Sequence, residues 1–272
     1  MLLEDRSALV IGGGRGIGRA AAIALAAEGA NVAVAARTRA DVEAVATEIE
    51  ASGRRALPLT IDVSEWEAVD AGVRTVLDAF GSVDILVNTA GVVAPIGLMA
   101  EADAAEWQRN IAINLLGTFN ATHAVLGAML TSGRGKIVLL SSLIASRVFP
   151  RFSAYAVSKA GIDHLTRTLA VELQGTNVHI NAIYPGQTDT AMHAEIRAVP
   201  RERIGDDVWR YYQEAKQQAR LLRPEQPARL ILFLASPLSD GISGRVMPIE
   251  DPEAQSWLAA LDAREGGQVL RN

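Results

Sequence analysis

A glycine-rich turn near the start of the chain limits the fold more strongly than any other feature. Residues 12–18 read GGGRGIG, and they lie between a short apolar run at 8–11 and an alanine-rich segment at 19–29. The apolar run is typical of a buried strand, and the alanine-rich segment, which closes at Gly29, is typical of a helix. A strand, a glycine turn and a helix in this order predict the opening unit of a dinucleotide-binding fold.

The spacing of the glycines fits G-x-x-x-G-x-G, and no register fits G-x-G-x-x-G. Glycines leave no Cβ atoms near a pyrophosphate, and the free N–H groups at the positive end of the next helix can bind it. The alternative is a plain tight turn, but a second strand at 31–36 follows at the distance that a dinucleotide site requires. We therefore expect the cofactor to contact Gly12, Gly14, Arg15, Gly16, Ile17 and Gly18.

The rest of the chain alternates between strand-like and helix-like segments, without internal repeats or low-complexity stretches. Further strands are expected at 56–61, 85–88, 136–140, 178–183 and 245–249. Further helices are expected at 41–51, 68–80, 103–131 (bent near Gly117), 153–173 and around 230–234. This alternation predicts one α/β domain over residues 1–272, a Rossmann-like doubly wound parallel sheet of about seven strands with helices on both faces. Ligands of such a sheet bind at the carboxyl ends of the strands.

Composition excludes several classes of function. The net charge of -5 comes without a basic stripe, so nucleic acid is not expected as a partner. The chain has no cysteine, which excludes disulfides and thiolate catalysis and suits a reducing cytoplasm. Residues 1–6 lack the pattern of a signal peptide, and no apolar run reaches the ~20 residues that span a bilayer. We therefore expect a cytoplasmic protein without a membrane partner.

The histidines do not predict a metal site, because no pair has the helical spacing of zinc ligands. His123, His164 and His179 are expected to be structural or surface residues. His193 falls in a segment that we interpret below as a lid, and contact between its ring and a substrate is the less favoured interpretation.

Tyr155 and Lys159 are the strongest candidates for acid–base chemistry. They are four residues apart, which places both side chains on one face of a helix. A free tyrosine has a pKa near ~10, and a neighbouring positive charge lowers it. Lowering the pKa by about three units requires roughly 4 kcal/mol, to which Lys159 and a bound, positively charged nicotinamide ring can both contribute. Because Tyr-x-x-x-Lys also occurs by chance, the interpretation depends on the other motifs.

Taken together, the motifs resemble the short-chain dehydrogenase/reductase family from about Leu3 to about Ile249. Besides the glycine turn and the Tyr–Lys pair, the resemblance rests on these features: Asp62-Val63, Asn88-Thr89-Ala90-Gly91, Asn114, Ser142 thirteen residues before Tyr155, and Pro185-Gly186-Gln187-Thr188-Asp189-Thr190. Within the family the chain looks most like reductases of 3-oxoacyl thioesters (acyl-carrier-protein reductases) and related ketone reductases. The resemblance implies hydride transfer between a nicotinamide cofactor and a ketone or secondary alcohol.

The resemblance also implies a role for each catalytic candidate. Tyr155 would give its proton to the carbonyl oxygen during reduction and take it back during oxidation. Ser142 would hydrogen-bond the same oxygen, with Ser141 as a rival and a strand-end cap as the alternative. Lys159 would lower the pKa of Tyr155 and bind the nicotinamide ribose. Asn114 would hold a water that links Lys159 to solvent, unless it only bonds locally within its helix.

Further cofactor contacts follow from the same resemblance. It places Asp62 at the adenine and Asn88 and Ala90 beside the adenosine ribose, and Val63 is a further expected cofactor contact. The remaining expected contacts, around the carboxamide, the pyrophosphate and the nicotinamide ring, are Pro185, Gly186, Thr188 and Thr190. Gly91 is expected to shape the turn.

The end of the second strand predicts the type of nicotinamide cofactor. NAD sites carry an acidic residue about 20 residues after the glycine turn, where it accepts from the ribose 2′-OH. Here the chain has Arg37, with Arg15 in the glycine turn and Arg39 as a weaker candidate. Because guanidinium groups bind phosphates in charge-assisted pairs, we expect NADP(H), with NAD(H) as the alternative. A solvated surface position is the other interpretation of each arginine.

Three departures from the family pattern stand out. Ile11 replaces the usual Thr before the first glycine, and Thr89 replaces the second Asn of the usual pair. The stretch 249–253 lacks the usual paired glycines. The tail that follows, 254–272, carries an apolar face of Trp257, Leu258 and Leu261; in many relatives this end packs against another subunit, and the alternative is a frayed surface tail.

The substrate cannot be derived from the sequence. Residues 191–222 are interpreted as a lid that mixes apolar and charged side chains, although a surface helix pair has the same pattern. A nucleotide-sensing module without catalysis is one alternative, but it needs no proton donor. An epimerase or dehydratase with the same Tyr–Lys pair is another, although such relatives usually carry a larger C-terminal domain.

Residues 111–130 predict a homo-oligomer, most simply a tetramer, with a dimer as the alternative. Their apolar side chains exceed one helix face, so one side can cover the sheet while the other needs a partner. These side chains are Ile113, Leu115, Leu116, Phe119, Val125, Leu126, Met129 and Leu130.

Overall fold

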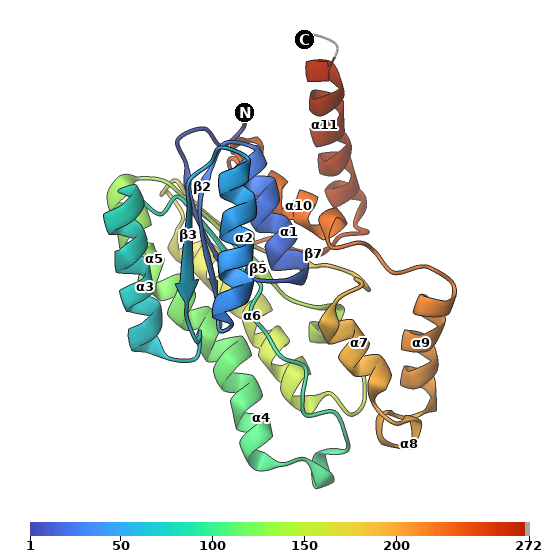
Figure 1. The fold of residues 1–272 in the computed structure, drawn as a ribbon. Helices are drawn as coiled ribbons and strands as arrows, with labels where there is room; N and C mark the ends of the chain where they lie inside the picture. Colours follow the sequence, from blue (N-terminus) through green and yellow to red (C-terminus); the bar gives the residue numbers. More distant parts are fainter. Residues whose placement is uncertain (270–272) are drawn as a thin grey trace.

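A single parallel sheet forms the centre of the protein (Figure 1). The computed structural model describes residues 1–269, with side chains described as far as Arg264. The strand order is β3-β2-β1-β4-β5-β6-β7, and all six neighbouring pairs are parallel. The strands are β1 (Ser7–Ile11), β2 (Asn31–Ala36), β3 (Ala56–Thr60), β4 (Ile85–Asn88), β5 (Gly135–Leu140), β6 (Val178–Tyr184) and β7 (Val246–Pro248). The order reverses between β1 and β4, which opens a crevice at their carboxyl ends.

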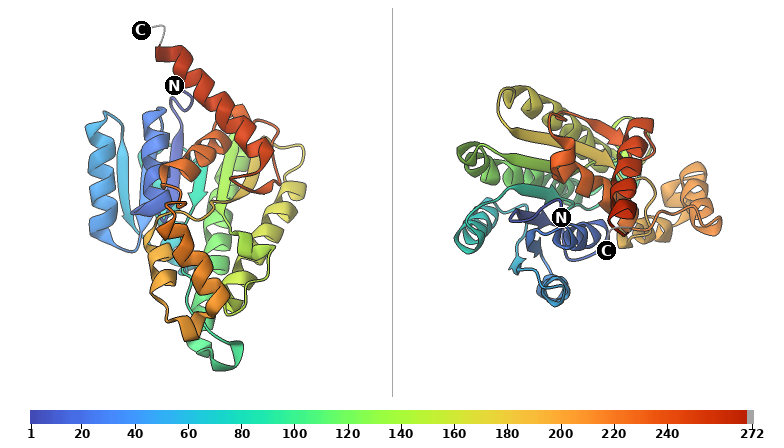
Figure 2. Two further views of the ribbon diagram at one scale, coloured as in Figure 1. Left: turned by 90° about the vertical axis from the view of Figure 1, so that its right-hand side faces the viewer. Right: turned by 90° about the horizontal axis from the view of Figure 1, so that it is seen from above.

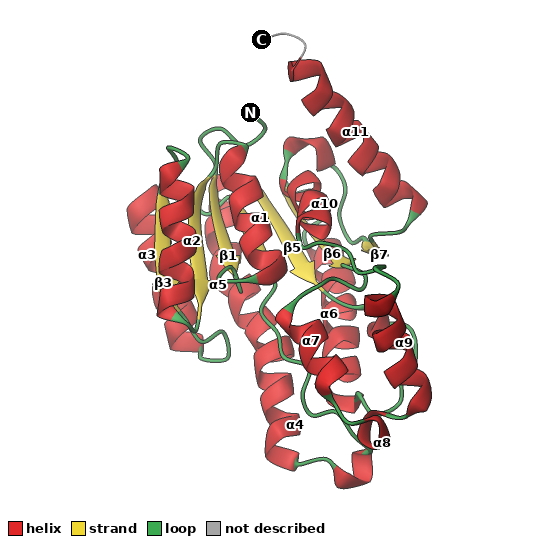
Figure 3. Cartoon of the chain, turned by 45° about the vertical axis from the view of Figure 1, so that its right-hand side comes forward, coloured by secondary structure: helices red, strands yellow, loops and turns green. Residues whose placement is uncertain are grey.

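Helices cover both faces of the sheet (Figure 2). One apolar core joins the sheet to α1 (Gly16–Ala27), α2 (Arg39–Ala51), α10 (Glu225–Ala235) and α11 (Pro252–Val269). The other core joins it to α3 (Trp66–Phe80), α5 (Gly117–Ser132) and α6 (Ser153–Glu172). Beyond the carboxyl ends of the strands lie α4 (Ala104–Ile111), α7 (Ala191–Ala198), α8 (Arg201–Ile204) and α9 (Asp206–Gln217), as Figure 3 shows. The predicted single doubly wound α/β fold is therefore confirmed.

The long helical region differs from the prediction in how it bends. We expected a break near Gly117, but α4 and α5 are continuous through a π-helical turn, Ala112–Leu116. Gly117 is needed for packing, because a Cβ atom there would lie 2.7 Å from the Val63 side chain. In the described part of the chain, Ala104–Ser132 is the one helix long and apolar enough to cross a membrane, but 44% of its apolar window is buried in the protein. It packs on α3 and α6 as a core helix does.

The C-terminal tail forms the helix α11, and its first part packs against the core, so the frayed interpretation is wrong for residues 254–261. Ala254 and Leu261 of α11 are fully buried in the core beside α10. Trp257 stacks on Phe233 with ring centroids 5.1 Å apart. The apolar face of the tail therefore packs against its own chain. Residues 270–272 lie outside the described residues.

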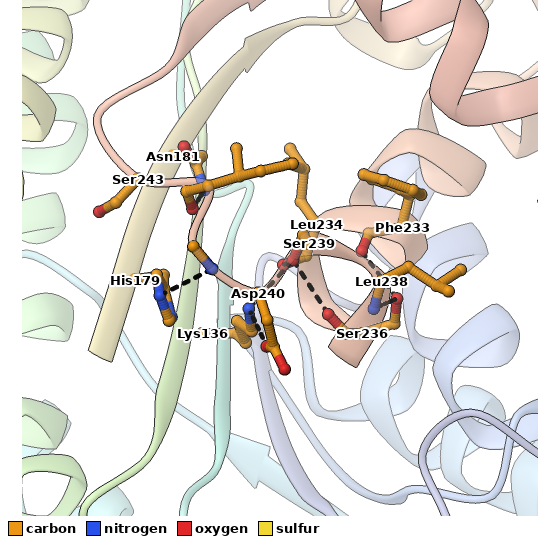
Figure 4. A network of polar contacts seen from close by, with 12 residues as sticks. Lys136, His179, Asn181, Phe233, Leu234, Ser236, Leu238, Ser239, Asp240 and Ser243 are labelled. Atoms are coloured by element: carbon orange, nitrogen blue, oxygen red, sulfur yellow. Dashed lines mark hydrogen bonds and ion pairs between the residues drawn. The ribbon is translucent and has the colours of Figure 1, made fainter. Parts of the chain in front are cut away.

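A polar cluster joins the end of α10 to the amino ends of β5 and β6 (Figure 4). Lys136 donates to the Ser239 hydroxyl at 3.1 Å and pairs with Asp240 at 2.8 Å. The Gly241 amide donates to Nε2 of His179 at 3.1 Å. These contacts satisfy polar groups where the chain returns to the sheet, at the end of the sheet formed by the amino ends of the strands. A small cavity of about 140 Å³ opens at the same edge.

Candidate active site

The glycine turn forms a tight contact between β1, α1 and the residue after β4. A Cβ atom on Gly12 would lie 2.6 Å from the Ala90 amide, and one on Gly18 would collide with the Thr89 hydroxyl. No side chain caps the first turn of α1, which also contains no acidic residue. Its free N–H groups therefore face the crevice and fit a pyrophosphate.

The expected adenosine contacts lie at the carboxyl ends of β3 and β4, on either side of β2 and β1. Asn88 is buried and donates to the Thr118 hydroxyl at 3.1 Å, while its Oδ1 accepts from the Ala90 amide. Asp62 accepts from the backbone and the hydroxyl of Ser64. The pKa of Asp62 is lowered below its usual range: burial opposes the change, the Ser64 hydrogen bonds favour it, and the charges of Arg37 and Arg109 add to it. Arg37 is therefore close enough to act on Asp62 electrostatically.

The loop after β6 closes the other side of the crevice. Thr190 packs against the glycine turn, since a Cβ atom on Gly16 would lie 3.4 Å from its methyl group. Thr188 donates to the Pro185 carbonyl at 3.0 Å. Gly186 has a φ of +70°, and a Cβ atom there would lie 2.7 Å from the Glu250 carboxylate. Glu250, in the stretch without the family's usual glycine pair, thus lies against the expected nicotinamide loop.

The catalytic candidates come together at the ends of β5 and α6. The Ser142 hydroxyl is near enough to the Tyr155 hydroxyl to lower the Tyr155 pKa. Lys159 is buried; its Nζ donates to the Leu140 carbonyl at 2.6 Å and lies 5.6 Å from the centre of the Tyr155 ring. One helix therefore presents a phenol and an ammonium to a strand end that carries a hydroxyl, as the sequence predicts.

The predicted lowering of the Tyr155 pKa is wrong for the protein by itself. Burial raises the pKa of Tyr155 to about 12, and the Ser142 hydrogen bond only partly opposes this. The cause is geometric: the Tyr155 hydroxyl is enclosed, with Sδ of Met192 at 3.9 Å, while Lys159 points back toward Leu140. Burial also lowers the pKa of Lys159 to about 8.

Asn114 lies in the π-helical turn and is fully buried. Its Oδ1 accepts from the Val92 amide at 2.8 Å, and its Nδ2 contacts the Val92 carbonyl, Asn110 and Ser158. The side chain thus fixes the loop after β4 beside Lys159. A role in holding water stays a prediction.

Ser141 and Ser142 are the two candidates for the hydroxyl that binds the substrate oxygen, and their surroundings differ. Ser141 is buried and donates to Asp163 at 2.5 Å, whereas Ser142 faces Tyr155. The sequence analysis did not single out Asp163, although its position one turn after Lys159 was a usable signal.

The segment 191–222 forms three helices above the crevice. Its two ends are joined: the Asp189 amide donates to the Leu222 carbonyl, and the Leu222 amide donates to the Gln187 carbonyl, both at 2.8 Å. An apolar cluster joins these helices to the loop after β4 and to Phe152, with Tyr155 and Met192 packed against it. Beside this cluster is a cavity of about 610 Å³, lined by residues 95–98, 101–102, Arg151, Glu202 and Arg203.

His193 is buried between α7 and α9 rather than exposed. Its Nδ1 contacts the Arg197 guanidinium, which can only donate, so Nδ1 is the acceptor and the ring is neutral. Its ring lies 5.1 Å from that of Tyr212. Burial, then the Arg197 charge, lower the pKa of His193 to about 4, against the opposing charge of Asp189.

The protein is expected to lose stability between pH 7 and pH 5 because of His193. The unfolded chain binds a proton near pH ~6.5 while the folded protein does not, so stability is present above that pH and falls below it. The loss from this group is about 2 kcal/mol at pH 5. Urea unfolding of wild type and His193→Gln at both pH values measures it. The variant should lose less on acidification, the exposed His164→Gln should behave as wild type, and identical losses in all three would contradict the assignment.

Within residues 1–269, no group of three or more His, Asp or Glu side chains has an arrangement that could hold a metal ion.

Known proteins share the sequence pattern and the fold of this chain. Residues 6–200 match the family described as short chain dehydrogenase. The short-chain reductase protein NovJ of Streptomyces niveus is 37% identical over 250 residues, covering 91% of this chain and 93% of NovJ. The 3-oxoacyl-[acyl-carrier-protein] reductase FabG of Thermotoga maritima is 32% identical over 250 residues, covering 92% and 98%. Among solved structures, an NAD⁺-bound xylitol dehydrogenase superposes with a TM-score of 0.85 at 27% identity, covering 92% of this chain and 99% of that one.

Proposed function

This chain belongs to the short-chain dehydrogenase family, and from that premise we propose an NADP(H)-dependent oxidoreductase that interconverts a ketone and a secondary alcohol. Membership of the family supports the broader part of this proposal, namely that the protein is an enzyme that acts on CH–OH and C=O groups with a nicotinamide cofactor. The finer proposal rests on one observation: Tyr155 and Lys159 lie on one face of α6, with Nζ of Lys159 5.6 Å from the centre of the Tyr155 ring, and Ser142 is near enough to act on the Tyr155 hydroxyl.

The proposed chemistry assigns one task to each side chain. The nicotinamide, when bound, supplies or accepts the hydride. Tyr155 is protonated at neutral pH, which is the form that gives a proton to a carbonyl oxygen. Ser142 holds that oxygen, and the positive charge of Lys159 favours the phenolate left behind. The amino terminus of α1 and the glycine turn bind the pyrophosphate. The strand-end residues described above bind the adenosine and the nicotinamide.

A preference for NADPH is supported by the charges at the end of β2. Arg15, directly before α1 in the glycine turn, and Arg37, directly after β2, are both exposed. Arg39, the weaker candidate, is paired with Glu43 at 2.6 Å. Arg15 and Arg37 are therefore the proposed ligands of a 2′-phosphate. NAD(H) remains the alternative, and the similar xylitol dehydrogenase is NAD⁺-bound.

The proposed substrate is a medium-sized, largely apolar ketone that fits under 191–222 as a lid. The apolar cluster reaches from this segment to Tyr155, and Met192 lies over the reacting hydroxyl. A carbonyl that displaces Met192 would meet Tyr155 and Ser142 together.

A panel of ketones and alcohols, followed at the nicotinamide absorbance band with NADPH and NADH, tests this proposal. The panel should include a 3-oxoacyl thioester, alkyl-substituted cyclic ketones and polyols. Turnover of at least one ketone is expected. Tight cofactor binding without turnover of any member would favour the nucleotide-sensing alternative, and a substrate that isomerises or loses water without net change in the cofactor would favour an epimerase or dehydratase.

The homo-oligomer stays a proposal, supported by exposed apolar side chains on α5 and the turn before it. Ile113, Val125 and Met129 are buried in the core, whereas Leu116 and Phe119 are 52% and 49% exposed. Both faces of this helix are therefore apolar, as the sequence predicts, and the outer one is the proposed contact between copies.

Light scattering is expected to give the mass of a dimer or tetramer for wild type at micromolar concentration. Because the exposed face would be buried between copies, Leu116→Glu with Phe119→Glu should reduce that mass. Val148→Glu, which places a charge on an exposed apolar side chain outside α5, serves as the control and should not. A monomeric wild type would rule out the proposed contact.

A further inference from the structure

A buried carboxylate lies one helical turn after Lys159. Asp163 is 4% exposed, its Oδ1 accepts from the Ser141 hydroxyl at 2.5 Å, and its Oδ2 accepts from the Tyr184 hydroxyl. Hydrogen bonds that donate to a carboxylate favour its charged form. Burial nevertheless raises the pKa of Asp163, while the two hydroxyls, Arg167 and Lys159 oppose the rise.

The two hydroxyls connect Asp163 to the parts of the site that must be aligned. Ser141 immediately precedes Ser142 at the end of β5, and Tyr184 immediately precedes Pro185-Gly186 at the end of β6. Asp163 shares α6 with Tyr155 and Lys159. One carboxylate therefore fixes the helix with the proton donor to both strand ends.

Asp163 is also the negative group that acts on Lys159. Around Lys159, β5 contributes the Leu140 carbonyl, α6 contributes the Tyr155 ring, and the loop after β4 contributes Gly91 beside Asn114. None of these is charged at neutral pH. Burial lowers the pKa of Lys159, and the charge of Asp163 is the influence that raises it.

The titratable groups around Asp163 are Lys159 and Arg167 on α6 and Tyr184 on β6. Burial, then its hydrogen bond to Asp163, raise the pKa of Tyr184 to about 12, so Tyr184 stays a donor at neutral pH. Arg167 faces Asp163 and favours its charged form. Every partner of the carboxylate is therefore either a cation or a hydrogen-bond donor.

We propose that Asp163 is a positioning residue that keeps Lys159 protonated and holds the ends of β5 and β6 against the helix of Tyr155. The proposal rests on the proposed function, since it concerns the charge that Tyr155 needs for proton transfer. A negative charge here favours the protonated form of both Lys159 and Tyr155. Removing it therefore lowers the pH at which the pair loses a proton, whichever group loses it first.

The titration of Lys159 can be read without any substrate, because the chain has lysines only at positions 136, 159 and 216. In protein labelled at the lysine Cε, Asp163→Asn is expected to lower the titration midpoint of Lys159 by about one pH unit or more. The signals of Lys216 and Lys136, which pair with Asp189 and Asp240, should not move. An unchanged Lys159 midpoint in a folded Asp163→Asn overturns the proposal. A wild-type Lys159 that is already neutral at pH 7 overturns it with no variant needed.

The pH profile of ketone reduction gives a second readout. In Asp163→Asn the alkaline limb of kcat/KM should move to lower pH by a similar amount. Asp163→Glu keeps the charge and should restore the limb, and Tyr184→Phe, which removes one hydrogen bond but no charge, should leave the limb in place. A lower rate with an unmoved limb in Asp163→Asn would mean a purely structural role and overturn the proposal. If the wild type turned over no ketone, the proposed function would be wrong, but the role of Asp163 would still be decided by the titration of Lys159.

Discussion

Replacing Tyr155 with phenylalanine is expected to remove nearly all turnover, a loss of about 10²- to 10⁴-fold in kcat. The change deletes one hydroxyl and keeps the ring, so the contact of the ring with Lys159 and its packing against the apolar cluster under α7 persist. Ser142 then has no proton donor beside it. Steady-state kinetics with the best ketone of the panel, together with cofactor binding followed by nicotinamide fluorescence, measure the effect.

Cofactor binding and unfolding midpoint should stay close to wild type in Tyr155→Phe. Tyr211→Phe, which removes a hydroxyl from α9, is the matched control and should keep its activity. If Tyr155→Phe retained more than a tenth of wild-type turnover in a step shown to be chemistry, Tyr155 would not be the proton donor.

The exchange of Arg37 for aspartate is expected to turn a preference for NADPH into a preference for NADH. A guanidinium–phosphate hydrogen bond contributes about 1.5–3 kcal/mol, or roughly 10- to 150-fold in affinity. The new carboxylate would repel a 2′-phosphate and could accept from a ribose 2′-OH instead. The ratio of kcat/KM for the two cofactors, in wild type and variant, measures the change.

Arg39→Asp is the matched control, because it makes the same charge change two residues away on a side chain already paired with Glu43. It should shift the ratio far less. A wild type that favours NADH, or an Arg37→Asp that keeps the NADPH preference, would show that the phosphate is bound elsewhere or that the protein uses NAD(H).

The fold was predictable because its signals are local and repeated. The glycine turn, seven apolar runs and the helices between them each mark one element, and parallel alternation then leaves few topologies. Ser142 and Tyr155 were predictable for another reason: their spacing in sequence is a property of one strand–helix unit. In the structure Ser142 is near enough to lower the pKa of Tyr155, and the catalytic roles of the two residues stay predictions.

The properties that sequence reasoning missed depend on surroundings built from distant segments. The pKa of Tyr155 is raised by burial, and Met192, far along the chain, is one of the residues beside the hydroxyl. His193 is buried by α9, and Asp163 is bonded by residues of two strands. The π-helical turn at Asn114 and the packing of Trp257 on Phe233 are likewise set by tertiary contacts that no short motif records.

Thr89 ties the end of β4 to the end of β1 at the glycine turn. Its amide and its hydroxyl both donate to the Ile11 carbonyl, at 2.9 Å and 3.1 Å. Because the acceptor is a backbone carbonyl, neither bond depends on the side chain at position 11, which carries no hydroxyl here. A substitution at position 11 should therefore keep both bonds, whereas a substitution that removes the Thr89 hydroxyl loses one of them. Of these two departures from the family pattern, residue 89 is the one that sequence design at the cofactor turn has to keep.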